Sequence, residues 1–167
     1  MRRAASFLGS ALFLSALVPT PAHALLCDAL LGCSCNVTAT PMAFGQVQPL
    51  SGAAGTASSD IHVGCSGVVD IAPSVSVKFN AGAWGTTADR QMRSAAGDRL
   101  RYNIYKTSQP ATILGDGTNG FPALTVSGGL LQLGSWSVTS TVYGQAPAVT
   151  TIKPGVYGDT VVVRIDW

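Results

Sequence analysis

The chain has 167 residues and a formal net charge of +2 at pH 7, and only 11% of its residues are charged. So small a charge gives no electrostatic reason to expect a nucleic-acid partner or an anionic membrane surface. Glutamate is absent, whereas Gly, Ala, Ser, Thr and Val are abundant. This composition disfavours long helices and favours strands that are joined by turns.

The first 24 residues have the pattern of a secretory signal peptide. Two arginines at positions 2 and 3 precede a largely apolar stretch, and residues 22–24 read Ala-His-Ala, a small-x-small cleavage pattern. The apolar stretch is shorter than the roughly 20 residues of a membrane-spanning helix, and an uncleaved anchor is the alternative. We therefore expect an exported protein whose mature part, residues 25–167, is one domain. Without the two arginines this part carries no net charge.

Four cysteines lie in the first part of the mature chain. An even number in an oxidising compartment favours disulfides, and four cysteines allow three pairings. We expect Cys35–Cys65 together with Cys27–Cys33, while a competing arrangement bonds Cys33 to Cys65. The Cys35–Cys65 bridge would close a loop of about 30 residues, which stabilises by about 3–4 kcal/mol in the chain-entropy model. A zinc site is not expected, because one residue separates Cys33 from Cys35 where zinc knuckles have two.

From residue 35 onward the sequence alternates between strand and turn patterns, so we expect about seven short strands. In chain order the candidate strands cover residues 36–44, 61–65, 71–79, 99–106, 124–126, 130–133, 136–143 and 160–167. Residues 51–58 are expected to be a loop rich in Gly, Ala and Ser, and residues 80–97 a second, longer loop. The short strands at 124–126 and 130–133 are expected to pair with each other.

Alternation of apolar and polar residues predicts which side chains of the strands face the core. The inward residues are expected to be Ile71, Val75, Val77 and Phe79, then Leu100, Tyr102 and Ile104, and in the last strand Val161, Val163, Ile165 and Trp167. Trp136 is also expected in the core. No segment after the signal peptide has a helical period, so the expected fold class is all-β, a β-sandwich.

Residues typical of catalytic or metal sites are sparse. His62 is the one histidine after the signal peptide, and we expect it to face solvent on the strand face opposite Ile61 and Val63. The sequence contains no nucleophile elbow, no zinc-protease motif and no phosphate-binding glycine loop. The glycine-rich residues 115–120 lack the alternating ligands of a calcium loop and are expected to be a turn. We expect no enzymatic activity, no cofactor and no small-molecule substrate.

An ordered set of motifs points to one family. Residues 35–45, Cys-Asn-Val-Thr-Ala-Thr-Pro-Met-Ala-Phe-Gly, resemble the pattern C-x-V-x-A-T-x-x-x-F-G that opens spore coat protein U domains. Further landmarks follow in the family's order, at residues 61–65, 90–92, 100–105, 115–117, 143–147 and 155–159. The mature chain is therefore similar to the spore coat protein U domain family, which is also that of the archaic (Csu-type) chaperone–usher pilus subunits.

The resemblance implies an immunoglobulin-like β-sandwich that lacks its last strand and is completed by donor-strand addition. The partners that it implies are a periplasmic pilus chaperone, an outer-membrane usher and neighbouring pilus subunits. The protein would pass through the periplasm to the cell surface. The walls of the strand-accepting groove would be formed by Val161, Val163, Ile165 and Trp167 on one side and by Val37 with Met42 or Phe44 on the other.

A subunit that polymerises needs a strand-donating segment before its first strand, and a Cys27–Cys33 loop would bend that segment. We therefore expect a subunit that accepts a strand and donates poorly, such as a pilus-tip or terminal subunit. Adhesion would use exposed apolar loops, for which Trp84 and the pair Leu130 and Leu131 are candidates, while a buried Trp84 is the alternative. The competing function is a self-sufficient secreted coat or ligand-binding sandwich that does not polymerise.

Overall fold

The computed structural model describes residues 32–47 and 52–167, and the expected signal peptide and Cys27 lie outside these described residues. Every regular element in the described part is a β-strand. The strands are β1 Ser34–Ala39, β2 Gly55–Asp70, β3 Ser74–Phe79, β4 Arg90–Ser94, β5 Arg99–Tyr105, β6 Leu124–Ser127, β7 Gln132–Ala146, β8 Tyr157–Gly158 and β9 Val163–Asp166. Within the described residues, no helix has the length and apolarity to cross a membrane.

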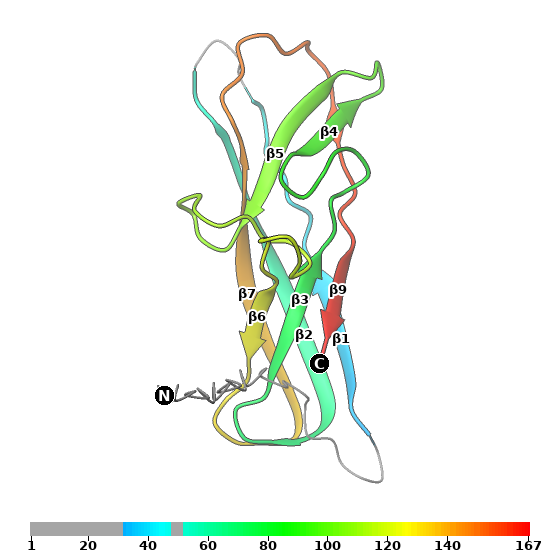
Figure 1. Ribbon diagram of the computed structural model, residues 1–167, viewed down its shortest axis with the longest axis vertical. Helices are drawn as coiled ribbons and strands as arrows, with labels where there is room; N and C mark the ends of the chain where they lie inside the picture. Colours follow the sequence, from blue (N-terminus) through cyan, green and yellow to red (C-terminus); the bar gives the residue numbers. More distant parts are fainter. Residues whose placement is uncertain (1–31, 48–51) are drawn as a thin grey trace, which may run out of the picture.

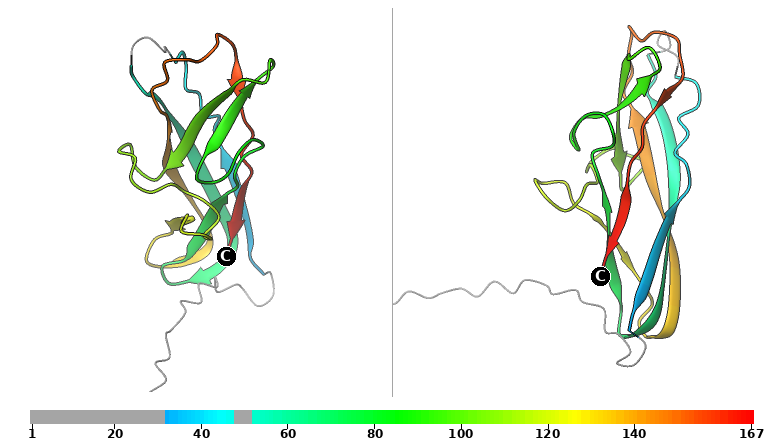
Figure 2. Two further views of the ribbon diagram at one scale, coloured as in Figure 1. Left: turned by 45° about the horizontal axis from the view of Figure 1, so that its top comes forward. Right: turned by 90° about the vertical axis from the view of Figure 1, so that its right-hand side faces the viewer.

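The strands form two antiparallel sheets that pack face to face, so the expected all-β sandwich is confirmed (Figures 1 and 2). The larger sheet has six strands in the order β1-β2-β7-β5-β4-β8, and the smaller has three in the order β6-β3-β9. Strands β2 and β7 pair along almost their whole length, from Gly55 opposite Ala146 to Asp70 opposite Gln132. These two long strands run along most of the length of the elongated molecule.

Side-chain alternation places the core between the two sheets, much as the sequence predicts. In β3, Val75, Val77 and Phe79 are buried, and the intervening residues are partly exposed. In β5 the buried alternate residues include Leu100 and Tyr102. Each fully buried aliphatic or aromatic side chain stabilises the fold by roughly 1.5–3 kcal/mol, so these alternating faces hold the sheets together.

For two residues the predicted position in the core is wrong. Ile71 is 75% exposed, because β3 begins only at Ser74 and the preceding Ala72 takes a left-handed φ of 55° that breaks the alternation. Trp167 is 45% exposed, because it lies beyond the last residue of β9, where the pairing with β3 has ended. The other tryptophan assigned to the core, Trp136, is 7% exposed, and this expectation is confirmed.

Several expected element boundaries also need correction. The first strand ends at Ala39 rather than at residue 44, and part of the expected loop 51–58 belongs to β2, which begins at Gly55. The long loop 80–97 contains β4. The expected hairpin between 124–126 and 130–133 is absent from the described part of the chain, since β6 pairs with β3 instead and β7 begins at Gln132.

Candidate functional site

The two sheets leave a groove between the segment that follows edge strand β1 and the segment that leads into edge strand β9. Figure 1 shows these strands side by side, each at the outer edge of its own sheet, and no ladder joins them among the described residues. Beyond Ala39 the chain runs on as residues 40–47, which form the first rim of the groove. Residues 152–161, with Val163, form the second rim, and the space enclosed has a volume of about 1210 Å³.

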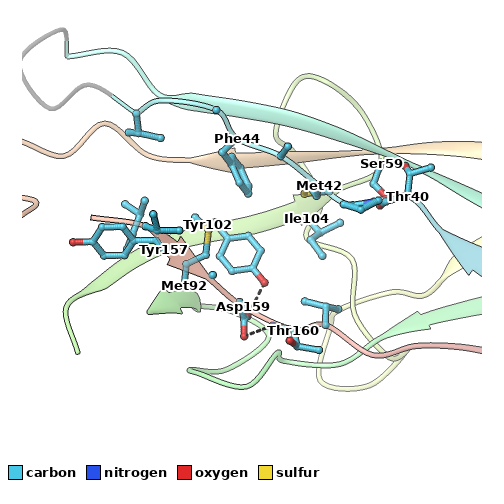
Figure 3. Close-up of a pocket in the computed structure, with 18 of the residues that line it drawn as sticks. Thr40, Met42, Phe44, Ser59, Met92, Tyr102, Ile104, Tyr157, Asp159 and Thr160 are labelled. Atoms are coloured by element: carbon cyan, nitrogen blue, oxygen red, sulfur yellow. Dashed lines mark hydrogen bonds between the residues drawn. The ribbon is translucent and has the colours of Figure 1, made fainter. Parts of the chain in front are cut away.

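The floor of the groove is made of side chains that belong to the sandwich core. The lining contributed by the sheets comprises Ile61, Phe79, Met92, Leu100, Tyr102, Ile104 and Val142. From the first rim, Phe44 reaches down to Tyr102, and the two rings meet edge to face with centroids 5.7 Å apart (Figure 3). These floor side chains are each at most 7% exposed. The exposed apolar surface of the groove therefore comes mainly from its rims, where Met42, Phe44, Val161 and Val163 are only partly buried.

A glycine lets the first rim lie close to the larger sheet. Gly144 lies in β7, and a Cβ atom there would be 2.8 Å from Cζ of Phe44 and would overlap Sδ of Met42. Any side chain at this position would push both rim residues away from the sheet. This requirement gives a physical reason for the glycine in the Tyr143-Gly144 landmark.

The backbone of the second rim is fixed from the side of β3. The N–H of Asn80 donates to the carbonyl oxygen of Val162 at 3.2 Å, and the N–H of Val162 donates to Oδ1 of Asn80 at 2.9 Å. Successive residues of an extended chain direct their backbone groups to opposite sides. Val161 and Val163 therefore direct their N–H and C=O groups away from β3, toward the open side of the groove.

The first rim obeys the same rule. The N–H of Thr40 donates to the carbonyl oxygen of Asp60 in β2, and the hydroxyl of Ser59 donates to the carbonyl oxygen of Thr40 at 2.6 Å. Thr40 is thus turned toward β2, and the preceding residue, Ala39, directs its backbone groups to the free edge. Ala39 on one side and Val161 and Val163 on the other thus direct backbone groups into the same space.

A polar cluster holds the second rim where it crosses from β8 to β9. The phenol of Tyr102 donates to Oδ2 of Asp159 at 2.7 Å, and Oδ1 of Asp159 accepts the N–H groups of Ala83 and Thr160, each at 2.8 Å (Figure 3). Burial, followed by this hydrogen bond to Asp159, raises the pKa of Tyr102 well above its ordinary value. The phenol therefore remains a hydrogen-bond donor throughout the physiological pH range.

Behind the rim lies a fully buried arginine, Arg90. The sequence predicts a loop at this position and indicates no role for the residue. Its Nε and Nη2 donate to the carbonyl oxygen of Asn80 at 2.9 and 2.8 Å. Nη2 also donates to the carbonyl oxygen of Leu114 at 2.9 Å, and Nη1 donates to Oδ1 of Asn103 at 2.8 Å. Burial lowers the pKa of Arg90. Arg90 thus fixes Asn80, which in turn fixes Val162 at the groove.

The residues predicted to form the groove walls are only partly brought together. Met42, Phe44, Val161 and Val163 line the groove. Val37 pairs with Val63 in β1 and β2, and Ile165 pairs with Val77 in β9 and β3; both are half-buried against the core but outside the groove lining. Trp167 is exposed and does not contribute.

The remaining predicted site residues lie elsewhere. A disulfide joins Cys35 in β1 to Cys65 in β2, as expected. Cys33 is also disulfide-bonded, and Cys27, its expected partner, lies outside the described residues. Trp84 is partly buried with the guanidinium of Arg93 4.6 Å from its ring centroid. Leu130 and Leu131, by contrast, are exposed.

In the described part of the chain, no group of three His, Cys, Asp or Glu residues could hold a metal ion. His62 is exposed, as expected, and its Nδ1 lies 2.7 Å from the hydroxyl of Thr139 on the neighbouring strand. His62 is not part of the groove lining, and it is exposed where its neighbour Ile61 is buried. The arrangement at the groove is suited to binding an extended apolar chain.

Comparisons with known proteins give one family and one fold. The family model described as "Spore Coat Protein U domain" matches residues 22–164. Among solved structures, the chain is similar to a chain of the "CsuC-CsuE chaperone-tip adhesion subunit pre-assembly complex from archaic chaperone-usher Csu pili of Acinetobacter baumannii". The identity is 20% and the TM-score 0.52, over 81% of this chain and 40% of that one, so the likeness concerns the fold. No curated protein matches the chain.

Proposed function

The chain belongs to the Spore Coat Protein U domain family, and from this premise we propose that it is an exported subunit of a chaperone–usher pilus. In this proposal the groove between residues 40–47 and 152–163 accepts a β-strand from a partner. A periplasmic chaperone provides the strand first, and a neighbouring subunit replaces it at the outer-membrane usher. The protein then passes from the periplasm to the cell surface.

The observation that carries this proposal is the apolar groove above the core. Core side chains from both sheets form its floor, and partly exposed apolar residues lie on its two rims. Apolar surface left in water forgoes about 25 cal/mol for each Å² that burial would yield. A strand laid in the groove would cover this surface and would also pair with the backbone of Val161 and Val163. Pairing with the backbone requires an extended partner, which favours a strand over a compact small ligand.

Shape and chemistry of the groove define the strand that it would take. One face of the strand would meet Met42 and Phe44 on the first rim and Val161 and Val163 on the second. Side chains on a strand alternate between two faces, so the partner should carry apolar residues at every second position. Each buried apolar side chain would stabilise the complex by roughly 1.5–3 kcal/mol. Each backbone hydrogen bond would add about 0.5–1.5 kcal/mol.

Position in the pilus follows, in this proposal, from the cysteines. Cys33 is disulfide-bonded while Cys35 is bonded to Cys65, and Cys27 is then the partner we assign to it. A loop closed between Cys27 and Cys33 could not lie extended in a neighbour's groove. We therefore assign the chain to the tip or end of a pilus, with Leu130 and Leu131 as exposed apolar contacts for adhesion. Peptide mapping without reduction tests the loop, and a free Cys27 would refute this assignment.

Capture by a chaperone tests strand acceptance directly. Three forms of the full chain would each be co-expressed with a periplasmic chaperone from the same genome: the wild type, Val163→Asp and Val162→Asp. Val163 lines the groove, whereas Val162 is 50% exposed and outside its lining, so the same charge enters on opposite sides of one rim. We expect Val163→Asp to lose co-purification and Val162→Asp to keep it. Equal recovery of both variants would refute the groove as the acceptor site.

The competing function, a self-sufficient secreted coat or ligand-binding sandwich, is supported by the rim contacts that Asp159 and Asn80 make within the chain itself. Thermal unfolding separates the two. A high cooperative transition of the isolated chain that a chaperone does not change would favour the self-sufficient sandwich. A low transition that a chaperone raises would favour the pilus subunit.

A further inference from the structure

The outer face of the β4–β5 hairpin gathers three exposed arginines: Arg93, Arg99 and Arg101. The inner face of the same hairpin contributes Met92, Leu100 and Tyr102 to the groove. The arginines therefore lie on the opposite side of the sheet, where an inserted strand would not cover them. We call Arg93, Arg99 and Arg101 the arginine face.

Two of these arginines are placed where like charges are unfavourable. Arg93 and Arg99 are directly opposite each other in the β4–β5 ladder. The neighbouring pair is hydrogen-bonded, with the N–H of Ser94 donating to the carbonyl oxygen of Asp98 at 2.9 Å. Pairs alternate along an antiparallel ladder, so Arg93 and Arg99 form a non-hydrogen-bonded pair, whose side chains approach most closely. Like charges in such a position destabilise a sheet.

No carboxylate compensates this pair in the described part of the chain. Neither Arg93 nor Arg99 has a carboxylate oxygen within 4.0 Å there. The nearby Asp98 is engaged by Lys153 at 2.9 Å, and Asp89 by Arg101 at 3.2 Å. The positive charges of Arg93 and Arg99 thus have no close carboxylate among the described residues, which leaves them available to an anion from outside.

Neighbouring side chains hold the guanidinium groups in place. The guanidinium of Arg93 lies 4.6 Å from the ring centroid of Trp84. Nη1 of Arg99 donates to Oε1 of Gln91 at 2.8 Å, and Nε2 of Gln91 donates to Oδ2 of Asp89 at 3.0 Å. A guanidinium has five N–H donors, and Arg99 uses one of them here, so donors remain for an anion. Ordering the arginines in advance lowers the entropic cost of binding.

We propose that the arginine face binds the sulfate or carboxylate groups of an acidic polysaccharide. The planar guanidinium fork of arginine can donate two parallel hydrogen bonds to two oxygens of a carboxylate or sulfate group. A single-stranded nucleic acid would need free aromatic faces on which its bases stack, and the guanidinium of Arg93 covers one face of the neighbouring ring, Trp84. Duplex DNA typically involves about 6–10 phosphate contacts, more than three arginines supply.

Binding of the full chain, in complex with its chaperone, to immobilised dextran sulfate tests the proposal, with unmodified dextran as the uncharged reference. The test variant is Arg93→Gln/Arg99→Gln. The matched control, Lys106→Gln/Arg164→Gln, removes the same charge from exposed residues outside the arginine face. We expect about tenfold weaker binding for the test variant, the combined effect of two exposed ion pairs, and less than a twofold change for the control.

Three outcomes would overturn the proposal. Equal loss in the test and control variants would mean that total charge alone drives binding. Equal retention on dextran and dextran sulfate would exclude an anion site. Tighter binding of a single-stranded oligonucleotide than of dextran sulfate, abolished in Arg93→Gln/Arg99→Gln, would overturn the polysaccharide assignment. Recovery of both variants with the chaperone shows that each is folded. If the wild type forms no chaperone complex, the same binding assay is run on the isolated full chain, so failure of strand acceptance and failure of anion binding are distinguishable.

Discussion

Replacing Arg90 with methionine should strongly destabilise the protein and loosen the second rim of the groove. The side chain of Arg90 is fully buried, and its four shortest hydrogen bonds go to three acceptors. These acceptors are the carbonyl oxygens of Asn80 and Leu114 and the side-chain oxygen of Asn103. Methionine fills much of the same volume but donates no hydrogen bond. The three acceptor oxygens would therefore remain buried and would lose the hydrogen bonds that Arg90 donates to them.

The expected magnitude follows from those three acceptors. A buried acceptor left unpaired costs about 1–3 kcal/mol, so the gross loss is roughly 3–9 kcal/mol. Removing Arg90 also removes a burial penalty, the same penalty that lowers the pKa of this side chain. We expect the net decrease in the free energy of unfolding to be about 3–5 kcal/mol, as for loss of one partner of a buried charged pair.

Urea unfolding of the strand-complemented protein measures this change. Arg90→Lys is the matched variant, because lysine keeps the charge but lacks the planar fork that reaches Asn80 and Asn103 together. We expect an intermediate loss of about 2 kcal/mol for Arg90→Lys. Faster hydrogen exchange at the amide of Val162, which donates to Asn80, would report the loosened rim. A loss below about 1 kcal/mol for Arg90→Met, with unchanged exchange at Val162, would refute the reasoning.

Three further predictions concern the same fold. Replacing Cys35 and Cys65 together with serine should lower the free energy of unfolding by about 3–4 kcal/mol, measured in urea, and a loss under about 1 kcal/mol would contradict the entropic account. The raised pKa of Tyr102 means that its contribution to stability is complete below pH 10 and is lost as the pH rises further. Between pH 9 and about pH 11 the melting temperature of the wild type should thus fall more than that of Tyr102→Phe. An equal fall in the two proteins would contradict a stabilising role for the protonated phenol. Gly144→Ala should displace Phe44 and weaken binding of the chaperone by about 1–3 kcal/mol. Unchanged affinity would mean that residues 40–47 can move away from β7 without loss of binding.

The sheets could be predicted where side-chain alternation is strong. Val75, Val77 and Phe79 alternate with polar residues, and burial on one face follows directly from that pattern. Residues 55–58 could not be assigned in this way, because their Gly, Ala and Ser composition is typical of a loop. Pairing with residues 143–146 of β7 makes them a strand, so a contact distant in sequence overrides local preference.

The groove walls could be predicted in part for a similar reason. Val161 and Val163 belong to an alternating run, and Met42 and Phe44 belong to the motif that carries the family resemblance. The network behind the rim leaves no such pattern. Arg90 donates mainly to backbone carbonyl oxygens, which any residue provides, so no sequence motif marks its partners. The sequence shows only that charged residues are few in this chain. The burial that singles out Arg90 becomes visible only in the structure.

Arg90 and Asp159 together explain how the groove above the core can keep its shape. Arg90 holds the second rim from behind, outside the groove lining, and Asp159 ties the rim to Tyr102 and Ala83 at the lining itself. A rim held in this way loses little conformational entropy when a strand arrives, so more of the contact energy remains for affinity. Apolar packing could not provide this support, because a floor that collapses inward would close the groove. Directional hydrogen bonds from buried polar groups fix the rim without filling the groove. This function explains why an arginine is buried beside an apolar groove although burial of its charge costs free energy.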